Sequence, residues 1–306
     1  MGQTYVLAFS ACKTWLISAD EPLQQWLDYF ADLLGLPAAL GISDGADVEA
    51  IHCRPGNRDD FHPYTFLTEG CRDDEEERLY RFQTTQVSRT SQGIIADVDN
   101  SRGFTFQIVN MMFLLFPVYR DVLERGGIPV HAALVEKDGK AYLIAGSSGK
   151  GKSTCCKRIG DGWRCHCDDE SLVVPDPADG YRVHPVPTWS TFIFNGPAEK
   201  TWQSMRSFPL RGIFYLDQAE TDEVSLFPNN AFKAAFLNDA VLQFWHRYSN
   251  YFHEALRKKL HGMIFRNACS IADVVPAYRL AATIDGHFWK AMENALGSDD
   301  RTGTAI

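Results

Sequence analysis

The sequence has little that would hold the protein to nucleic acid or to an anionic membrane. Acidic residues outnumber basic ones by 39 to 30, which gives a formal net charge of -9 at pH 7. Such a deficit of positive charge argues against sequence-independent electrostatic binding to nucleic acid or to an anionic membrane. We therefore expect no nucleic-acid partner and no membrane partner, and positive potential only where the protein holds phosphate.

Long apolar runs and an export signal are also lacking. The longest apolar stretch, residues 108–119, is shorter than a membrane span and contains Asn110 and Pro117, so we expect a buried helix. The first residues show no basic start followed by an apolar core, and we expect a cytoplasmic protein. Hydrophobic residues form 45% and charged residues 23% of the chain, proportions typical of a folded globular protein.

The cysteines show no spacing that demands disulfides or zinc. Eight are present, and in a long chain without an export signal we expect reduced thiols. Four of them, with His166, cluster at Cys155, Cys156, Cys165 and Cys167. Adjacent and C-x-C spacings differ from the paired ligands of structural zinc, so burial is favoured and a metal site is the alternative.

The hydrophobic pattern predicts two regions with a boundary near residue 100. Residues 1–100 read as a small α+β domain, with strands at 4–9 and 14–18, a helix at 22–36, an irregular stretch at 44–63, and strands at 77–86 and 93–98. Residues 101–306 alternate strands and helices. We expect helices at 105–125, 151–158, 230–260 and 287–296, and strands at 129–136, 140–145, 164–167, 171–174, 212–216 and 276–283. The fold class is α/β, mixed α+β, in which helices flank a mixed sheet.

A phosphate-binding loop is the strongest signal in the chain. Residues 146–153 satisfy G-x-x-x-x-G-K-[ST], after an apolar strand and before a helix. The glycines let backbone N–H groups turn inward, and the start of the helix adds positive potential. Lys152 supplies a charge for the β- and γ-phosphates, and Ser153 can ligate Mg²⁺. The predicted nucleotide-binding residues are Gly146, Ser147, Ser148, Gly149, Lys150, Gly151, Lys152, Ser153 and Thr154.

Acidic residues and a histidine flank this loop in the sequence. Asp168 and Asp169 follow a short strand that we expect beside the strand preceding the loop, where carboxylates could reach a metal ion and an incoming hydroxyl. His131 lies on an expected strand, 21 residues before Lys152. Its position alone favours a buried structural histidine over a catalytic one.

Together, residues 130–154 and the sequence Cys-Asp-Asp-Glu at 167–170 resemble the HPr kinase/phosphorylase family. That family combines a strand histidine, a G-x-S-G-x-G-K-S loop and a paired aspartate. The layout is also similar to shorter relatives, the kinases of lasso-peptide precursors and the HPr-kinase-like protein of the SynChlorMet radical-SAM cassette. The resemblance covers about residues 130–170, and residues 1–100 do not resemble the N-terminal domain of the bacterial regulator.

The resemblance implies an ATP-dependent phosphotransferase that uses Mg²⁺ and acts on a serine-type hydroxyl of a peptide or small molecule. By motif position, Asp169 would be the general base and His131 would contact the transferring phosphoryl group. Lys152 would bind phosphates, while Ser153 and Asp168 would serve the metal. Peptide-modifying enzymes of the same pathway are expected partners.

The chain departs from the family pattern after the aspartate pair. The family has a metal-binding glutamate about 25 residues further on, whereas here the region reads TWSTFIFNG and the next glutamate is Glu199. The later basic loop of the family is also missing, and Arg211 is the candidate for its charge. Two alternatives to a kinase therefore stay open: a non-catalytic nucleotide-binding accessory protein and a simple ATPase.

Overall fold

The computed structural model describes residues 2–40, 47–56, 72–73, 76–82, 84–91, 93–197, 200–249, 251–252 and 254–302. Packing divides the chain into two compact units built from interleaved segments. Unit 1 comprises residues 1–125, 186–206 and 245–263, and unit 2 comprises residues 126–185, 207–244 and 264–306. The helices α6 (Asn230–Ser249) and α7 (Glu254–Val274) contribute to both units. The boundary predicted near residue 100 stays a prediction, because units that share helices do not define an independently folding domain.

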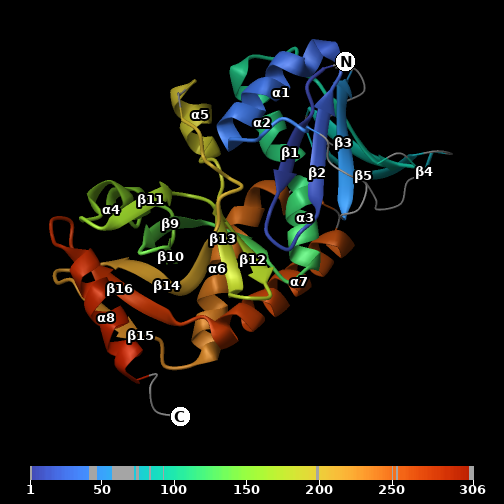
Figure 1. The fold of residues 1–306 in the computed structure, drawn as a ribbon. Coiled ribbons are helices and arrows are strands. Elements are labelled where there is room, and N and C mark those ends of the chain that lie inside the picture. The colour runs from blue at the N-terminus through green and yellow to red at the C-terminus, as the bar shows by residue number, and fades with distance from the viewer. Residues whose placement is uncertain are drawn as a thin grey trace. The chain divides into compact units, whose positions relative to one another are not determined.

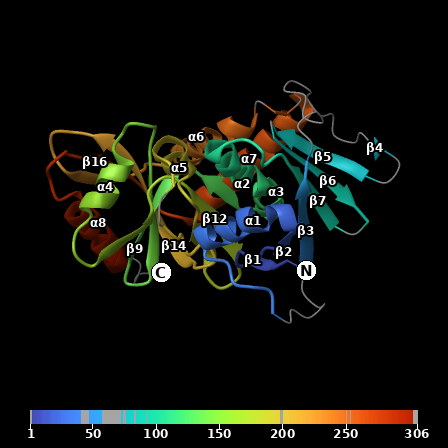
Figure 2. The same ribbon diagram turned by 90° about the horizontal axis from the view of Figure 1, so that it is seen from above.

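Unit 1 contains a mixed sheet in the order β1-β2-β3-β7-β6-β5-β4, whose strands lie side by side in Figure 2. Its strands are β1 (Tyr5–Ala8), β2 (Thr14–Ala19), β3 (Val48–Pro55), β4 (Arg72–Asp73), β5 (Glu76–Phe82), β6 (Thr85–Thr90) and β7 (Gly93–Val98). The helix α1 (Glu21–Leu34) packs on β2 and β3 through its apolar face. It ends at Gly35, whose φ of 67° is favourable for glycine.

The strand β3 corrects the expectation that residues 44–63 are irregular. Ile51 and Cys53 are fully buried and alternate with half-buried His52 and Arg54, as in a strand with one covered face. β3 pairs in parallel with β2 on one side and β7 on the other. The irregular structure was predicted from the glycine, proline and aspartate residues of this stretch. The strand instead forms through partners that are remote in sequence, which local composition does not report. The flanking residues 44–46 and 57–63 lie outside the described part.

The helix predicted at 105–125 is broken into α2 (Phe104–Leu114) and α3 (Phe116–Glu124). Pro117 at the start of α3 cannot donate the backbone hydrogen bond that would continue one helix. Asn110 is fully buried, and its amide accepts from the hydroxyl of Thr85 at 2.9 Å and donates to the carbonyl of Asp99 at 3.0 Å. Residues Phe104–Glu124 are together long and apolar enough to cross a membrane, yet 78% of their apolar 18-residue window is buried inside the protein, as in a core helix. The burial expected for residues 108–119 is therefore confirmed.

Unit 2 is built on a second mixed sheet (Figure 1), in the order β11-β9-β10-β14-β13-β12-β8, with β16 paired to β14 and β15 to β16. Its strands are β8 (Ile128–Val130), β9 (Ala132–Lys137), β10 (Lys140–Ala145), β11 (Trp163–Cys167), β12 (Ser171–Asp176), β13 (Gly180–Pro185), β14 (Phe208–Gln218), β15 (Glu223–Leu226) and β16 (Ala277–Ala282). β10, β14 and β16 run parallel, whereas β9 and β11 run antiparallel to their neighbours. The predicted mixed α/β fold with flanking helices is confirmed.

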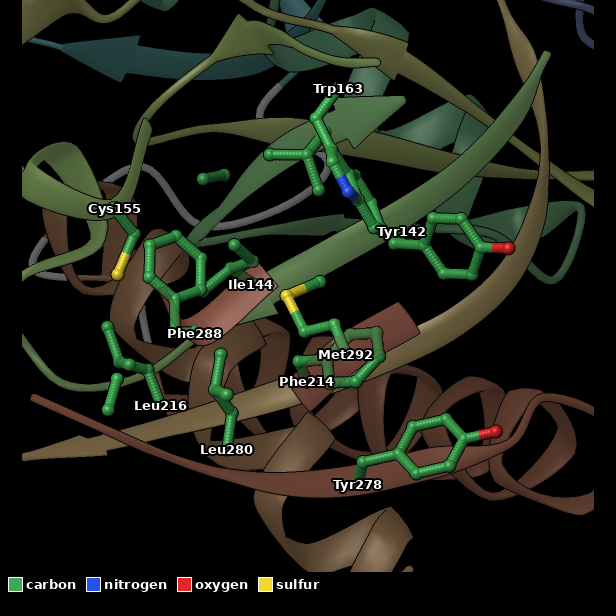
Figure 3. Close-up of a cluster of buried hydrophobic side chains, with 13 residues drawn as sticks. Tyr142, Ile144, Cys155, Trp163, Phe214, Leu216, Tyr278, Leu280, Phe288 and Met292 are labelled. Carbon is green, nitrogen blue, oxygen red and sulfur yellow. The ribbon is translucent and has the colours of Figure 1, made fainter. Parts of the chain in front are cut away.

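One face of this sheet is covered by α4 (Lys152–Arg158) and α8 (Phe288–Thr302). Figure 3 shows the buried side chains between them, among which Ile144, Phe214 and Leu216 come from the strands and Phe288 and Met292 from α8. Since side chains alternate along a strand, the residues between those on β14 point to the opposite face. The remaining helix, α5 (Trp189–Asn195), belongs to unit 1.

Candidate functional site

The glycine-rich loop connects β10, which ends at Ala145, to α4, which begins at Lys152, as its sequence predicts. Gly149 and Gly151 have φ values of 81° and 102°, which residues with a side chain rarely adopt. A Cβ atom added at either glycine would meet no heavy atom within 4 Å. The loop therefore has the backbone conformation that needs glycine and open space beside it, and this fits a phosphate chain.

Lys152 lies folded back over the start of this loop. Its side chain is only 6% exposed, and its Nζ donates to the carbonyl oxygen of Gly146 at 2.8 Å and lies 3.5 Å from that of Ser147. Burial lowers the pKa of Lys152, and the nearby carboxylates of Asp169 and Asp168 act in the opposite direction. The ammonium is thus held by polar atoms that a phosphate oxygen could replace.

His131 connects this lysine to Asp169. The Nε2 atom of His131 lies 2.9 Å from Nζ of Lys152, and its Nδ1 atom lies 3.2 Å from Oδ1 of Asp169. A lysine ammonium can only donate, so Nε2 must accept, and the proton of a neutral ring must be on Nδ1. The geometry therefore selects one tautomer, in which the N–H group faces the carboxylate. The three side chains form a continuous polar chain from the loop to the acidic pair.

Strand pairing explains why these residues meet. Ala145 at the end of β10 pairs with Ala132 at the start of β9, and Cys167 at the end of β11 pairs with Leu134 of β9. Antiparallel neighbours thus bring the end of β10, the start of β9 and the end of β11 to one edge of the sheet. The prediction that β11 lies beside the strand preceding the loop is wrong, because β9 intervenes.

The position of His131 also differs from the sequence prediction. The strand expected at 129–136 is divided into β8 and β9, and His131 is the residue between them. β8 pairs with β12, whereas β9 pairs with β10 and β11, so the chain changes partners at this residue. Its backbone N–H instead donates to the carbonyl oxygen of Ala240 in α6 at 3.1 Å. A break in the strand places the imidazole over the loop, which composition alone could not show.

A magnesium ion would find few protein ligands here. Ser153 is exposed and Asp168 half-buried, and both belong to the edge just described. Among the described residues, no group of three or more histidine, cysteine, aspartate or glutamate side chains could hold a metal ion. Mg²⁺ commonly binds through one or two protein oxygens together with substrate phosphates and water. Ser153 and Asp168 are the side chains here whose oxygens such an ion would use.

The two departures from the family pattern concern a metal-binding glutamate and a basic loop. Glu199 lies outside the described residues. Arg211 pairs with Asp179 at 3.0 Å, near the start of β14, while the loop follows the end of the parallel strand β10. Parallel strands start at the same edge, so Arg211 lies at the wrong end of the sheet to bind phosphate, and its candidacy is withdrawn.

A basic residue that the sequence did not reveal, Arg279, shares a carboxylate with Lys150 of the loop. The Nζ atom of Lys150 is 2.7 Å from Oδ1 of Asp217, and Arg279 lies 3.2 Å from Oδ2 of the same carboxylate. These contacts lower the pKa of Asp217, with the hydrogen bond from Lys150 as the largest cause. The three residues come from the loop, β14 and β16, which are distant in sequence, so no local pattern signals the network.

The cysteines of the cluster at residues 155–167 are partly or fully buried. Cys155 and Cys167 are buried, Cys156 and Cys165 are half-buried, and all seven cysteines in the described residues are free thiols. The sulfur of Cys165 lies 3.3 Å from the carbonyl oxygen of Cys167, and that of Cys156 lies 3.9 Å from the same oxygen. The predicted burial is thus confirmed for Cys155 and Cys167 and is partial for Cys156 and Cys165, while the reduced state stays a prediction and Cys71 lies outside the described part.

Fold and site together define a mixed α/β protein with a glycine-rich loop between a strand and a helix, whose lysine contacts a histidine that is paired with an aspartate. The chain matches the family model described as SynChlorMet cassette protein ScmC over residues 94–297, which is more than half of its length, and it belongs to that family. No curated protein matches the chain. The association with this cassette, expected from the sequence, is therefore confirmed.

Proposed function

We propose that the protein is an HPr-kinase-like phosphotransferase that moves the γ-phosphoryl group of ATP to a serine-type hydroxyl of a peptide or small molecule. The observation that carries this proposal is the chain from Lys152 through His131 to Asp169, with contacts of 2.9 and 3.2 Å. A loop that only binds nucleotide needs the lysine but neither of the other two. Membership of a cassette family fits a place in a pathway with other proteins of that cassette. We propose that this pathway modifies peptides in the cytoplasm and that its enzymes are the partners.

The described residues can perform the separate tasks of this transfer. The backbone between Gly146 and Ser153 would hold the triphosphate, and Lys152 would leave the carbonyl of Gly146 to donate to the β- and γ-phosphates. Asp169, which is 20% exposed on its side chain, would take the proton of the acceptor hydroxyl as its oxygen attacks the γ-phosphorus. The bond from that phosphorus to the β-phosphate oxygen breaks, and ADP leaves.

His131 has a positioning task in this scheme. Its Nδ1–H group holds the carboxylate of Asp169 at the edge of the sheet, and its Nε2 atom accepts from Lys152. Contact between Nε2 and a phosphoryl oxygen requires that this nitrogen gain a proton, because both atoms would otherwise be acceptors. Mg²⁺ held by Ser153, Asp168 and the phosphates would neutralise charge on the transferring group.

A direct test is transfer from γ-labelled ATP to a library of serine- and threonine-containing peptides. The wild-type protein should label a subset of peptides, and Asp169→Asn should bind an ATP analogue without labelling any. Asp161→Asn, at an exposed aspartate after α4, is the matched control and should behave as wild type. Labelling by Asp169→Asn at the wild-type rate would disprove the general-base role.

A second candidate is a nucleotide-dependent accessory protein without transfer activity. It is favoured by the small number of metal ligands, since the segment Trp189–Asn195 offers no acidic residue and the described part holds no group of three ligands. In that case ATP would act as a conformational ligand. Nucleotide would then bind to the wild-type protein and to Asp169→Asn equally, and neither would label a peptide or release phosphate. Release of phosphate without labelled peptide would instead indicate a simple ATPase.

A further inference from the structure

A cavity of about 450 Å³ opens beside the first half of the phosphate-binding loop, on the sheet face opposite the core of Figure 3. Its volume lies in the range of small-ligand sites. Aromatic rings from β14, the β15–α6 connection and α6 form much of its wall. The aromatic and polar residues that line this side of the cavity include Tyr215, Phe227, Phe232, Phe236, Asp239 and Gln243.

The rings form one packed cluster. The ring centroids of Tyr215, Phe227 and Phe236 lie 5.1–5.3 Å from one another, with interplanar angles between 54° and 85°. Phe232 is 52% and Phe236 is 47% exposed, although each is a large apolar side chain. Clustered, solvent-exposed aromatic residues at a concave surface are typical of a binding site.

The cavity adjoins the end of the loop where the γ-phosphate would lie. Gly146 and Ser147 line it, and their carbonyl oxygens are the ones that face Nζ of Lys152. Ala240 also lines it, and its carbonyl oxygen accepts from the backbone N–H of His131. The carbonyl oxygens that hold Lys152 and the one that holds the backbone of His131 thus belong to residues that line the cavity. A group bound there would be next to the reacting phosphoryl group.

A second, smaller cavity of about 300 Å³, which shares Lys150 and Leu216 with the first, offers a place for the nucleoside. It is lined by Gly151, Thr154, Arg158 and Thr283, on the flank of the loop towards α4, and does not include Gly146 or Ser147. Lys152, which would bind the β- and γ-phosphates, lies over Gly146 and Ser147 at the start of the loop. The nucleoside would therefore extend from the opposite side of the loop, towards α4. This assignment leaves the aromatic cavity to the acceptor.

Charge decides what the aromatic cavity can hold. Lys150 and Arg279 line it and would repel a cation, while Asp217, which pairs with both, and Asp239 would repel an anion. Within the described residues, the one hydrogen bond to Asp239 comes from the amide of Gln243 at 2.7 Å. A second donor can therefore approach this carboxylate. A neutral aromatic group with an N–H or O–H donor satisfies both the rings and Asp239.

Resting on the proposed kinase function, we propose that this cavity binds an aromatic side chain of the acceptor peptide next to the hydroxyl that is phosphorylated. Rings of the acceptor would pack on Phe236 and Phe232, and a donor such as an indole N–H or a phenolic O–H would bond to Asp239. The cavity thereby selects peptides with an aromatic residue near the serine or threonine.

Ligand-observed nuclear magnetic resonance with the whole protein and Mg²⁺–ATP analogue tests this without requiring transfer. The probes are N-acetyl amides of tryptophan, lysine, glutamate and alanine. The tryptophan probe should bind best. Phe236→Ala and Phe232→Ala, both at half-exposed positions, should each weaken it at least about fivefold. Phe265→Ala is the matched control, since Phe265 is 55% exposed and does not line the cavity, and should change binding by less than about twofold.

Three outcomes would overturn the proposal. The tryptophan probe could bind no better than the alanine probe, or the lysine or glutamate probe could bind best. Phe236→Ala could also weaken the ATP analogue while sparing the tryptophan probe, which would place the nucleobase in this cavity. Absence of phosphate transfer together with the expected probe pattern would count against the proposed kinase function and not against the binding of aromatic groups.

Discussion

We predict that replacement of Asp169 by asparagine separates phosphate transfer from nucleotide binding. The asparagine keeps the size of the side chain and can still offer an oxygen to Nδ1 of His131, now 3.2 Å from the carboxylate. It cannot take a proton from an acceptor hydroxyl. A general base contributes about 10²- to 10⁴-fold to such a step, so the transfer rate should fall by about that factor.

The effect on nucleotide binding follows from the charges. Asp169 reaches Lys152 across the His131 ring, and two unit charges about 8 Å apart interact by roughly 2 kcal/mol at an effective dielectric constant of 20. The substitution removes repulsion between Asp169 and the γ-phosphate, which favours binding. It also removes attraction to Lys152, which lowers the pKa of that lysine further and opposes binding. The two effects oppose each other, so the dissociation constant should change by less than about tenfold.

The assay pairs calorimetry with an ATP analogue and single-turnover transfer from γ-labelled ATP, both with the same protein preparation. The expected result is a fall in transfer that exceeds any change in affinity by an order of magnitude or more. Equal losses of affinity and transfer would mean that Asp169 maintains the binding site and is not the base. Undiminished transfer would refute the reasoning entirely.

Further predictions concern charge and packing around the same loop. Because burial lowers the pKa of Lys152 in the folded protein, the charged lysine destabilises the fold, and Lys152→Met should raise the melting temperature of the nucleotide-free protein. This difference in melting temperature should shrink as the pH rises from the pKa of Lys152 in the folded protein towards its pKa in the unfolded chain, because the wild-type lysine then loses its charge. A variant that is no more stable than wild type at neutral pH would contradict this prediction. Calorimetry across pH should show that ATP affinity falls as the pH rises through the pKa of Lys152 in the folded protein. In Asp169→Asn this fall should occur at a lower pH, because the carboxylate that raises the pKa of Lys152 is gone. Phe288→Ala, at a fully buried position, should reduce the free energy of unfolding by about 3–5 kcal/mol in urea, and a loss near zero would contradict the packing. Asp217→Asn should cost less than about 1 kcal/mol, since its ion pair with Lys150 is about 40% exposed on both sides, and a much larger loss in the same titration would contradict that estimate.

Local sequence was enough to predict the loop and the elements on either side of it. Glycine at positions that need positive φ, the apolar strand before it and the helix after it are all encoded within residues 140–158. The hairpin before the loop is equally local, since Asp138 and Gly139 have φ values of 52° and 76°, as a tight two-residue turn requires. Such features depend on neighbours in the chain, and they were predicted with correct bounds to within a residue or two.

Features that depend on partners remote in sequence were missed. The position of β11 beyond β9, the strand β3 and the division at His131 all follow from pairings between distant segments. The aromatic cavity assembles rings from β14, the β15–α6 connection and α6 with loop residues some 70 positions earlier. The hydrophobic periodicity of a single segment cannot predict that side chains from these distant segments line one cavity. The sequence predicted Asp168 and Asp169 from a short local motif, whereas the contact of Asp169 with His131, and through it with Lys152, depends on the sheet.

The most direct test of the account is isothermal titration of the protein with a non-hydrolysable ATP analogue and Mg²⁺, in wild type and in Lys152→Ala. We expect measurable heat with a one-to-one stoichiometry for the wild-type protein, and a loss of affinity of at least about tenfold for the variant, because the lysine supplies a charge-assisted bond to the phosphates. No heat with the wild-type protein, or identical binding by the two proteins, would contradict the claim that the loop between Gly146 and Ser153 binds a nucleoside triphosphate.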